Sequence, residues 1–375
     1  MTEALQQLLY RHVSAGTIPG AVAVLGSDDA EVVAVGLASV DGEPMRADAI
    51  MQIQSMTKPV TAVAALRSVE AGQLTLDESL ERWLPELADR RVLSRPTADL
   101  DDTVPADRPI TLRHLLTSTS GYGMAFGDSP LQRAMAENGT EAGAEPPALG
   151  ADEWLGRLSE LPLAFHPGEG WRYHHSYAVL GILLARVTER PLGDHLADDI
   201  FAPLGMVDTA FWVPEDKLDR LPAAYRLGDD GLIEIDPAGG GFYAGAPAFD
   251  VSHGELVSTA GDYVRFARML ADGGRANGTP MISAAHHALM TTDQVPEGSK
   301  AADSFFPGFW DETAWGFGLG ITTSGDHVGR YGWSGGQGTD FFVDPDGTVG
   351  ILLTQVELGP QVFAIAQELQ ALPPS

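Results

Sequence analysis

Two serines in this sequence lie in patterns typical of catalytic nucleophiles, and they are far apart in the chain. Ser55 opens the run SMTK, which ends at Lys58 and has the S-x-x-K spacing. Ser334 lies within residues 332–336, GWSGG, which have the G-x-S-x-G spacing of the nucleophile elbow. A serine hydrolase uses one nucleophile, so the two patterns are competing hypotheses.

Ser334 fails the further requirements of an elbow. The elbow places its serine on a turn from a strand into a helix, and an acid and a histidine follow it in the chain. Residues 335–348, GGQGTDFFVDPDGT, predict turn and strand instead of helix, and His327 is the last histidine. The order of serine, acid and histidine therefore cannot be completed.

Ser55 and Lys58 make a simpler and more favourable pair. If Ser55 opens a helix, Lys58 lies one turn later on the same face, and its amine can reach the serine oxygen. The start of a helix also favours an anion that develops there. Met56, Val60 and Val63 provide apolar surroundings, and burial lowers the pKa of an amine so that it can accept a proton. The alternative is a surface lysine whose stem lies along apolar groups while its ammonium stays in water.

Tyr173 offers a partner for this pair. It opens the run YHHSYAVLG, just before a strongly apolar helix pattern. A tyrosine close to a cation ionises more easily and can then act as a general base. Taken alone, the same residue also fits an ordinary half-buried tyrosine.

The elements that must position these residues are rich in β-structure at both ends of the chain and helical between them. GAVAVLGS and EVVAVGLAS predict a hairpin that turns at Asp28-Asp29, and WGFGLGITT, DFFVDPDG and TVGILLTQV predict later strands. Helices are predicted over residues 1–16, from Ser55 to about Gly72, over ITLRHLLTSTSG and SYAVLGILLARVTERPLGDHLADDIFAPLG, and over QVFAIAQELQAL. Residues 123–150 predict a mobile loop or flap.

This order of elements predicts two domains. Residues 1–85 and 245–375 form an α/β domain from both chain ends, and residues 86–244 form a helical domain inserted between them. We expect the active site at their interface.

The arrangement of motifs resembles the serine β-lactamase-like hydrolases, which include class C β-lactamases, D-stereospecific peptidases and family VIII carboxylesterases. The resemblance rests on SMTK, on YHH followed by AVLG, and on WSGG before the terminal strands. Supporting stretches are spread along nearly the whole chain: LTLDESLERWLPEL, ITLRHLLTSTSG, HPGEGWRYHHSYAVLG, IFAPLGM, LVSTAGDYVRFARML and YGWSGGQGT. The resemblance implies a β-lactamase-like α/β (α+β) fold, with an antiparallel sheet flanked by helices and a central helical domain.

The same resemblance implies roles for individual residues. Ser55 is the nucleophile, and Lys58 and Tyr173 share the acid and base work. The backbone N–H groups of Ser55 and Gly336 form the oxyanion hole. The stretch around Ser334 then lines the site, and its glycines let the backbone approach the substrate closely.

Two departures from the pattern bear on the substrate. Trp333 stands where class C β-lactamases have the lysine of their Lys-Thr-Gly motif, which helps to hold the antibiotic's carboxylate. His175 stands where the asparagine of the Tyr-x-Asn motif is usual. Both departures resemble the family VIII carboxylesterases more closely. Arg330 is a competing source of the missing cation.

The predicted substrate-binding residues are Trp333, Ser334, Gly335, His175 and Tyr122. Further aromatic residues that could form an apolar pocket, half or more of them being core residues instead, are Phe126, Phe306, Phe309, Trp310 and Trp315. The predicted function is a serine hydrolase that cleaves small carboxylic esters through an acyl-enzyme. An amide hydrolase, D-aminopeptidase-like or β-lactam-opening, is an alternative within the same class. A relative that transfers acyl groups, or that binds a ligand without catalysis, is an alternative of another class.

The composition restricts partners and cofactors. The net charge of −29 disfavours nucleic acid and anionic membranes as partners. The chain contains no cysteine, its adjacent histidine pairs are poor chelators, and H-E-x-x-H does not occur, so neither a metal nor a cofactor is expected. The N-terminus lacks the basic and apolar regions of a signal peptide, which predicts a cytoplasmic protein. The oligomeric state stays open.

Overall fold

The computed structural model describes residues 2–27, 30–124, 128–143 and 145–373. Within these ranges, seven strands form one antiparallel sheet in the order β11-β12-β13-β14-β15-β1-β2. Their bounds are β1 Gly20–Gly26, β2 Val33–Gly36, β11 Thr313–Trp315, β12 Gly320–Thr322, β13 Tyr331–Gly335, β14 Thr339–Val343 and β15 Val349–Leu353. Because β15 pairs with β1, the two ends of the chain are joined in one sheet, as predicted. The predicted hairpin of β1 and β2 is present, although its turn at Asp28-Asp29 lies outside the described residues.

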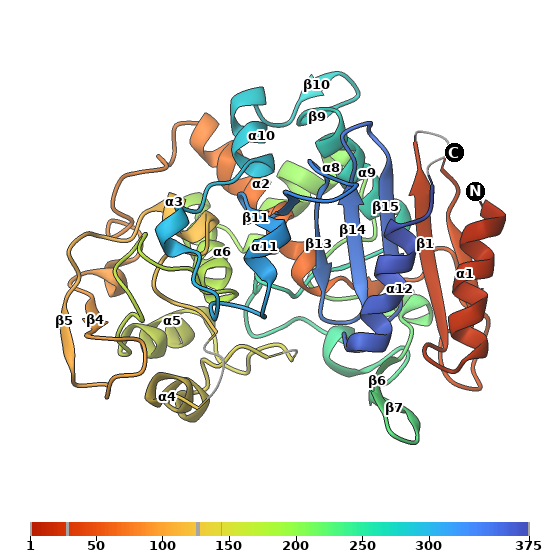
Figure 1. The fold of residues 1–375 in the computed structure, drawn as a ribbon, viewed down its shortest axis with the longest axis horizontal. Coiled ribbons are helices and arrows are strands. Elements are labelled where there is room, and N and C mark those ends of the chain that lie inside the picture. Colours follow the sequence, from red (N-terminus) through yellow and green to blue (C-terminus); the bar gives the residue numbers. More distant parts are fainter. Residues whose placement is uncertain (1, 28–29, 125–127, 144, 374–375) are drawn as a thin grey trace.

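Both faces of this sheet are buried under helices. Along β1, Val22 and Val24 belong to the main core, whereas Ala21, Ala23 and Leu25 belong to a second core cluster, because successive side chains point to opposite faces. Helices α2 (Thr57–Glu70) and α9 (Ala260–Ala271) contribute to the main core. Helices α1 (Thr2–Ser14) and α12 (Pro360–Gln370) contribute to the second cluster and contact each other. In Figure 1 they lie on either side of β1 in the view, near the two termini.

The middle of the chain supplies most of the remaining helices, which lie away from α1 and α12 in Figure 1. Their bounds are α3 Leu112–Leu116, α4 Pro130–Asn138, α5 Ala151–Ser159, α6 His175–Thr188, α7 Leu192–Leu196 and α8 Ala202–Leu204. Later in the chain come α10 Ala284–Thr291 and α11 Phe309–Glu312. Small two-stranded sheets pair β3 Met51–Gln52 with β8 Val257–Ser258, β4 Arg91–Leu93 with β5 Thr103–Pro105, β6 Ala224–Gly228 with β7 Gly231–Asp236, and β9 Arg275–Ala276 with β10 Thr279–Pro280.

Two predictions of local structure were wrong. Residues 123–150 were predicted as a loop, yet they contain α4, whose start is capped by the Ser129 side chain and whose end is turned by Gly139 at φ +76°. WGFGLGITT was predicted as one strand, yet β11 ends at Trp315 and β12 begins at Gly320. Gly318, at φ +80°, makes the turn between them.

Part of the predicted insertion, residues 86–244, also contacts elements of the sheet domain. Tyr225 in β6 forms a bridge with Val356 and lies in the second core cluster, to which β1 and α12 contribute. No helix in the described part of the chain combines the length and apolar character needed to cross a bilayer.

Candidate active site

Ser55 lies in a tight turn that leads directly into α2. This is a single 3₁₀ turn, Gln54–Met56, and the α-helix begins at Thr57. The helix was predicted to begin at Ser55, but Ser55 lies instead in the more tightly wound 3₁₀ turn before it. The N–H of Ile53 donates to the carbonyl of Leu256 at 3.0 Å, which ties the turn to the segment before β8. Ser55 therefore still precedes the helix, with its hydroxyl next to the first turn of α2.

Lys58 reaches the Ser55 hydroxyl from within the core. Its side chain is fully buried, and its Nζ lies 2.9 Å from Ser55 Oγ. The same nitrogen donates to the backbone carbonyl of His253. Burial lowers the pKa of Lys58 well below its ordinary value, and the opposing effect of the Glu255 charge is smaller. The neutral amine, which can accept a proton, is therefore favoured, and the surface alternative for this lysine is wrong.

Tyr173 lies over the same pair. Lys58 Nζ is 4.3 Å from the centroid of its ring, and its hydroxyl accepts a hydrogen bond from Trp333 Nε1 at 2.6 Å. Burial raises the pKa of Tyr173, and hydrogen bonds to Ser55 and Trp333 offset only part of that rise. Burial of the Tyr173 phenol and of the Lys58 amine therefore opposes the easier ionisation that the sequence predicted, and it favours the protonated phenol.

Strand β13 brings its glycines against the Ser55 turn. A Cβ on Gly335 would lie 2.4 Å from the carbonyl oxygen of Ile53 and 3.1 Å from Gln54 Cβ, so a side chain cannot be accommodated there. A Cβ on Gly336 would lie 3.9 Å from Gln54 Oε1. The backbone after Trp333 thus passes close to the nucleophile, as the glycine-rich sequence predicted.

Ser334 points away from this site. Its hydroxyl donates to Asp340 Oδ1 at 2.7 Å, and Gln370 in α12 donates to the other oxygen of Asp340 at 2.9 Å. Neighbouring residues of a strand face opposite sides of the sheet, so Ser334 and Trp333 cannot both face Tyr173. The prediction that the Ser334 side chain binds substrate is therefore wrong.

Arg330 also lies on the far side of the sheet from the candidate site. Two of its nitrogens donate to the Asp344 carboxylate at 2.7 and 2.8 Å, and a third donates to the Gln370 carbonyl at 3.1 Å. Its guanidinium covers the ring of Phe342 at 4.0 Å. Arg330 therefore does not replace the missing lysine of the third motif.

His175 is held by a structural contact. Its Nε2 lies 2.8 Å from the carbonyl oxygen of Thr140, and its ring stacks on Trp154 with centroids 6.0 Å apart. Only 1% of it is exposed, and burial lowers its pKa to about 4. This position is a correction, because the second-motif residue was expected to face the substrate. Its neighbour His174 lies near Lys58 instead, at the strained φ of +93°.

The aromatic residues divide between the core and a cluster beside Tyr173. Tyr122 is 3% exposed and packs in the main core, so its predicted role as a substrate contact is wrong. Phe126 lies outside the described residues. The cluster around Tyr173 contains the predicted Phe309, Trp310 and Trp315, together with Trp171, Met124, Val295, Phe305 and Trp333. Phe306 extends this cluster at the surface, with its ring tilted by 44° to that of Phe305 and 50% of the residue exposed.

Sequence reasoning missed several members of the site. Trp171 and Phe305 were overlooked because nothing in their spacing distinguishes them from core aromatics. His253 and Glu255 lie in the run SHGELVS, which no sequence motif singled out. Both side chains are buried, and the carbonyl of His253 accepts a hydrogen bond from Lys58. Burial of these two ionisable side chains is the signal that marks them as members of the site. That burial is visible only in the fold and not in the sequence.

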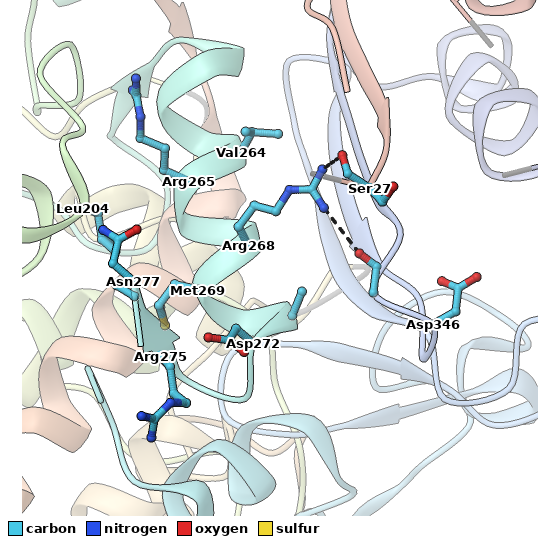
Figure 2. A pocket seen from close by; sticks show the side chains of 13 residues that line it. Ser27, Leu204, Val264, Arg265, Arg268, Met269, Asp272, Arg275, Asn277 and Asp346 are labelled. Atoms are coloured by element: carbon cyan, nitrogen blue, oxygen red, sulfur yellow. Dashed lines mark hydrogen bonds between the residues drawn. The ribbon is translucent and has the colours of Figure 1, made fainter. Parts of the chain in front are cut away.

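A separate cavity of about 730 Å³ lies between α9 and the turn that joins β14 to β15 (Figure 2). Its lining includes Arg265, Arg268 and Arg275 and none of the predicted site residues. Arg268 points across it and donates to the carbonyls of Gly26 and Ser27, which links α9 to the end of β1. This cavity is therefore distinct from the region around Ser55.

Comparisons with known proteins cover nearly the whole chain. The Beta-lactamase family model matches residues 5–372. Protein Rv1367c of Mycobacterium tuberculosis is 34% identical over 374 residues, which cover 96% of this chain and 91% of that protein. Lovastatin esterase of Penicillium rubens is 32% identical over 334 residues, with 82% and 79% covered. The solved structure of EstCE1, described as a hydrolase with promiscuous acyltransferase activity, superposes with a TM-score of 0.78 at 24% identity and 97% coverage of each chain.

Proposed function

The chain belongs to the beta-lactamase family and has its fold, and from that premise we propose that it is a serine esterase that cleaves small carboxylic esters through an acyl-enzyme. One observation carries the proposal. The fully buried amine of Lys58 lies 2.9 Å from the Ser55 hydroxyl, with the Tyr173 ring over it. A buried, neutral amine beside a serine hydroxyl at the N-terminus of a helix can remove the proton of that hydroxyl.

In the proposed acylation step, Ser55 Oγ attacks the carbonyl carbon of the ester. Its proton passes to the Lys58 amine, which becomes an ammonium. The bond between the carbonyl carbon and the alcohol oxygen then breaks, and Tyr173 donates its proton to the departing oxygen. The Lys58 ammonium returns a proton to Tyr173, so that the products are a free alcohol and an acyl ester on Ser55. Tyr173 serves first as an acid because burial keeps it protonated.

In the proposed deacylation step, water attacks the acyl ester. One water proton passes to Tyr173 while the Tyr173 proton moves to Lys58. The Lys58 ammonium then gives a proton to the Ser55 oxygen as that oxygen leaves, which restores the free enzyme and releases the carboxylic acid. The backbone N–H groups of Ser55 and Gly336 would stabilise the negative oxygen in both steps. The close packing of the Gly335–Gly336 backbone against Gln54 supports this assignment.

The surroundings of Tyr173 support an uncharged ester as the substrate. The indole of Trp333 occupies the place of a cationic residue, and Arg330 is bound to Asp344. Desolvating a β-lactam carboxylate without a partner costs about 2–7 kcal/mol, a range measured for polar groups and a lower bound for a charged one. The partly buried aromatics Phe305, Trp310 and Trp333 suit an apolar acyl or alcohol group. A relative that is named as an esterase agrees with this choice.

Side-by-side kinetics test the proposal. The panel contains p-nitrophenyl acetate and butyrate, nitrocefin, and D-alanyl amides, each measured with the native chain and with Ser55→Ala. We expect Ser55-dependent turnover with kcat/KM highest for an ester. Faster turnover of nitrocefin than of every ester would instead establish an amide hydrolase. An acyl-enzyme that is released only when a second alcohol is added would establish an acyltransferase.

A further inference from the structure

Behind Lys58 lies a buried group of ionisable side chains for which the steps above have no role. It consists of His174, His253, Tyr243 and Glu255, none of which is more than 9% exposed. The rings of His174 and His253 are 3.7 Å apart between centroids. Such a concentration of buried ionisable groups next to a general base is unusual in a core that serves only stability.

Glu255 is the acidic member of this group. It is 1% exposed, and its Oε2 accepts a hydrogen bond from the Tyr243 hydroxyl at 2.7 Å. Its Oε1 has no hydrogen-bond partner among the described residues and lies 3.7 Å from His253 Nε2. A buried carboxylate oxygen without a partner is destabilising, so its retention points to a role other than stability.

A rigid segment connects Glu255 to Lys58. The Lys58 amine donates to the carbonyl of His253, two residues before Glu255. Leu256 follows Glu255, and its N–H donates to Thr57 Oγ1 at 3.1 Å. Thr57 is the residue before Lys58 in α2. Contacts on both sides of Glu255 therefore hold its backbone in place beside α2, and the hydrogen bond from Tyr243 holds its carboxylate.

We propose that Glu255 is a positioning residue whose buried negative charge stabilises the ammonium form of Lys58, the form that arises when Lys58 takes the Ser55 proton. This inference rests on the proposed function. It gives Lys58 two opposing influences, burial that favours the amine and a fixed carboxylate that favours the ammonium. A general base works best when neither form is too stable, and Glu255 supplies the second influence.

Two groups beside Glu255 oppose the effect of its burial. Burial raises the pKa of Glu255 to about 7, whereas the hydrogen bond from Tyr243 and the charge of Lys58 lower it and so favour the carboxylate. The pKa values of His174 and His253 are lowered by burial and by Lys58, so the imidazoles stay neutral and do not compete as cations.

Other ionisable groups lie farther along the same network. Asp236, at the end of β7, influences Tyr243 and accepts a hydrogen bond from Gln52 at 3.0 Å. The Tyr173 ring lies over the Lys58 amine. Neither Asp236 nor Tyr173 is among the groups that change the pKa of Glu255, whereas the charge of Lys58 lowers it.

The direct test is the titration of Lys58 by NMR in the intact chain. The sequence contains three lysines, Lys58, Lys217 and Lys300, so ¹³C-labelled lysine gives three side-chain signals, and Lys58→Arg assigns one of them. Glu255→Gln keeps the shape and an oxygen acceptor for Tyr243 but removes the charge. We expect the pKa of Lys58 to fall by about one unit, because an opposite charge that favoured the ammonium is gone.

The kinetic test follows the acidic limb of the pH profile of kcat/KM. The limb should move to lower pH by about one unit in Glu255→Gln, and Glu255→Asp, which keeps the charge, should return it toward its original position. Asp236→Asn is the matched control, since it removes another buried carboxylate and should leave both the limb and the Lys58 titration unchanged. If Glu255→Gln does not fold, Tyr243→Phe replaces it. Loss of the hydrogen bond from Tyr243 raises the pKa of Glu255, so Glu255 stays neutral to higher pH and the pKa of Lys58 should fall as it does in Glu255→Gln.

An unchanged Lys58 titration in Glu255→Gln and in Tyr243→Phe would overturn the inference, whatever the substrate proves to be. A similar shift in Asp236→Asn would also overturn it, since any buried charge would then suffice. A shifted Lys58 titration in a protein that cleaves no ester would leave this inference standing and would reject the proposed function instead.

Discussion

The two sides of strand β13 differ in how completely their buried polar groups are hydrogen-bonded. On the face of Ser334, Asp340 accepts hydrogen bonds from Ser334 and Gln370 through its two oxygens. On the face of Trp333, the fully buried Lys58 is held mainly as an amine, and buried atoms of His253 and Glu255 have no hydrogen-bond partner among the described residues.

This difference distinguishes a side of the sheet whose buried polar groups stabilise the fold from a side whose buried polar groups are available for chemistry. A satisfied buried network rigidifies a fold, whereas an unsatisfied one reduces stability and persists where its reactivity is used. The residue types do not reveal the distinction, because serine, carboxylate and amide groups on the Ser334 face look as reactive as those near Lys58. The partners of each group decide its role.

The largest effect should come from the two serines. Ser55→Ala should lower kcat/KM for p-nitrophenyl butyrate by about 10³-fold or more, because the covalent route is lost. Ser334→Ala, the matched serine on the other face, should stay within about twofold, because its hydroxyl donates to Asp340 and points away from Tyr173. A fluorophosphonate label that maps to Ser334 by mass spectrometry would reverse the assignment of the two faces.

Lys58→Arg should give the next largest effect. The guanidinium keeps a positive charge but cannot accept a proton near neutral pH, so activity should fall by about 10²-fold or more. Steady-state kinetics measure the loss, and an unchanged circular dichroism spectrum shows that the variant is folded. Activity close to that of the native chain would reduce Lys58 to a structural group.

Trp333→Lys should change selectivity by about tenfold. A cation at this position would compensate a substrate carboxylate, so the ratio of kcat/KM for nitrocefin to that for p-nitrophenyl butyrate should rise. Trp333→Phe is the control, because it also removes the hydrogen bond to Tyr173 but adds no charge. An equal change of the ratio in both variants would show that the lost hydrogen bond, and not the charge, is responsible.

The smallest effects should appear in stability, with opposite signs on the two faces. Lys58→Met should raise the free energy of unfolding at pH 7 by about 1–3 kcal/mol, since the native pKa of Lys58 is depressed and unfolding lets the amine bind a proton. That gain should vanish as the pH rises above the ordinary lysine value of 10.5, where the unfolded chain no longer takes up that proton.

On the other face, Asp340→Ala should lower the free energy of unfolding by about 1–3 kcal/mol, because Ser334 and Gln370 lose their acceptor. Urea titrations at pH 7 and near pH 11 measure both variants. Destabilisation by Lys58→Met at pH 7 would contradict the contrast between the faces.

Much of the fold follows from local patterns in the sequence. Strand runs at both ends, with helices between them, predicted a sheet assembled from both termini, and β15 does pair with β1. The helix that was not predicted, α4, also has local signals. Ser129 caps its start and Gly139 caps its end, and both are common capping residues within a run of low periodicity.

The sequence by itself determined the spacing of Ser55 and Lys58, because three residues along a helical coil bring two side chains to one face wherever the helix lies. It also excluded Ser334 as an elbow nucleophile, because no histidine follows it. These conclusions depend on chain order and local geometry alone.

Only the tertiary structure decided which residues surround that pair. Tyr122 and His175 have the right types but lie in the core and on Thr140, whereas His253 and Glu255, about 200 residues later in the chain, lie against Lys58. Burial and charge act through space, so the pKa of Lys58 depends on groups whose distance in sequence is unrelated to their distance in the fold.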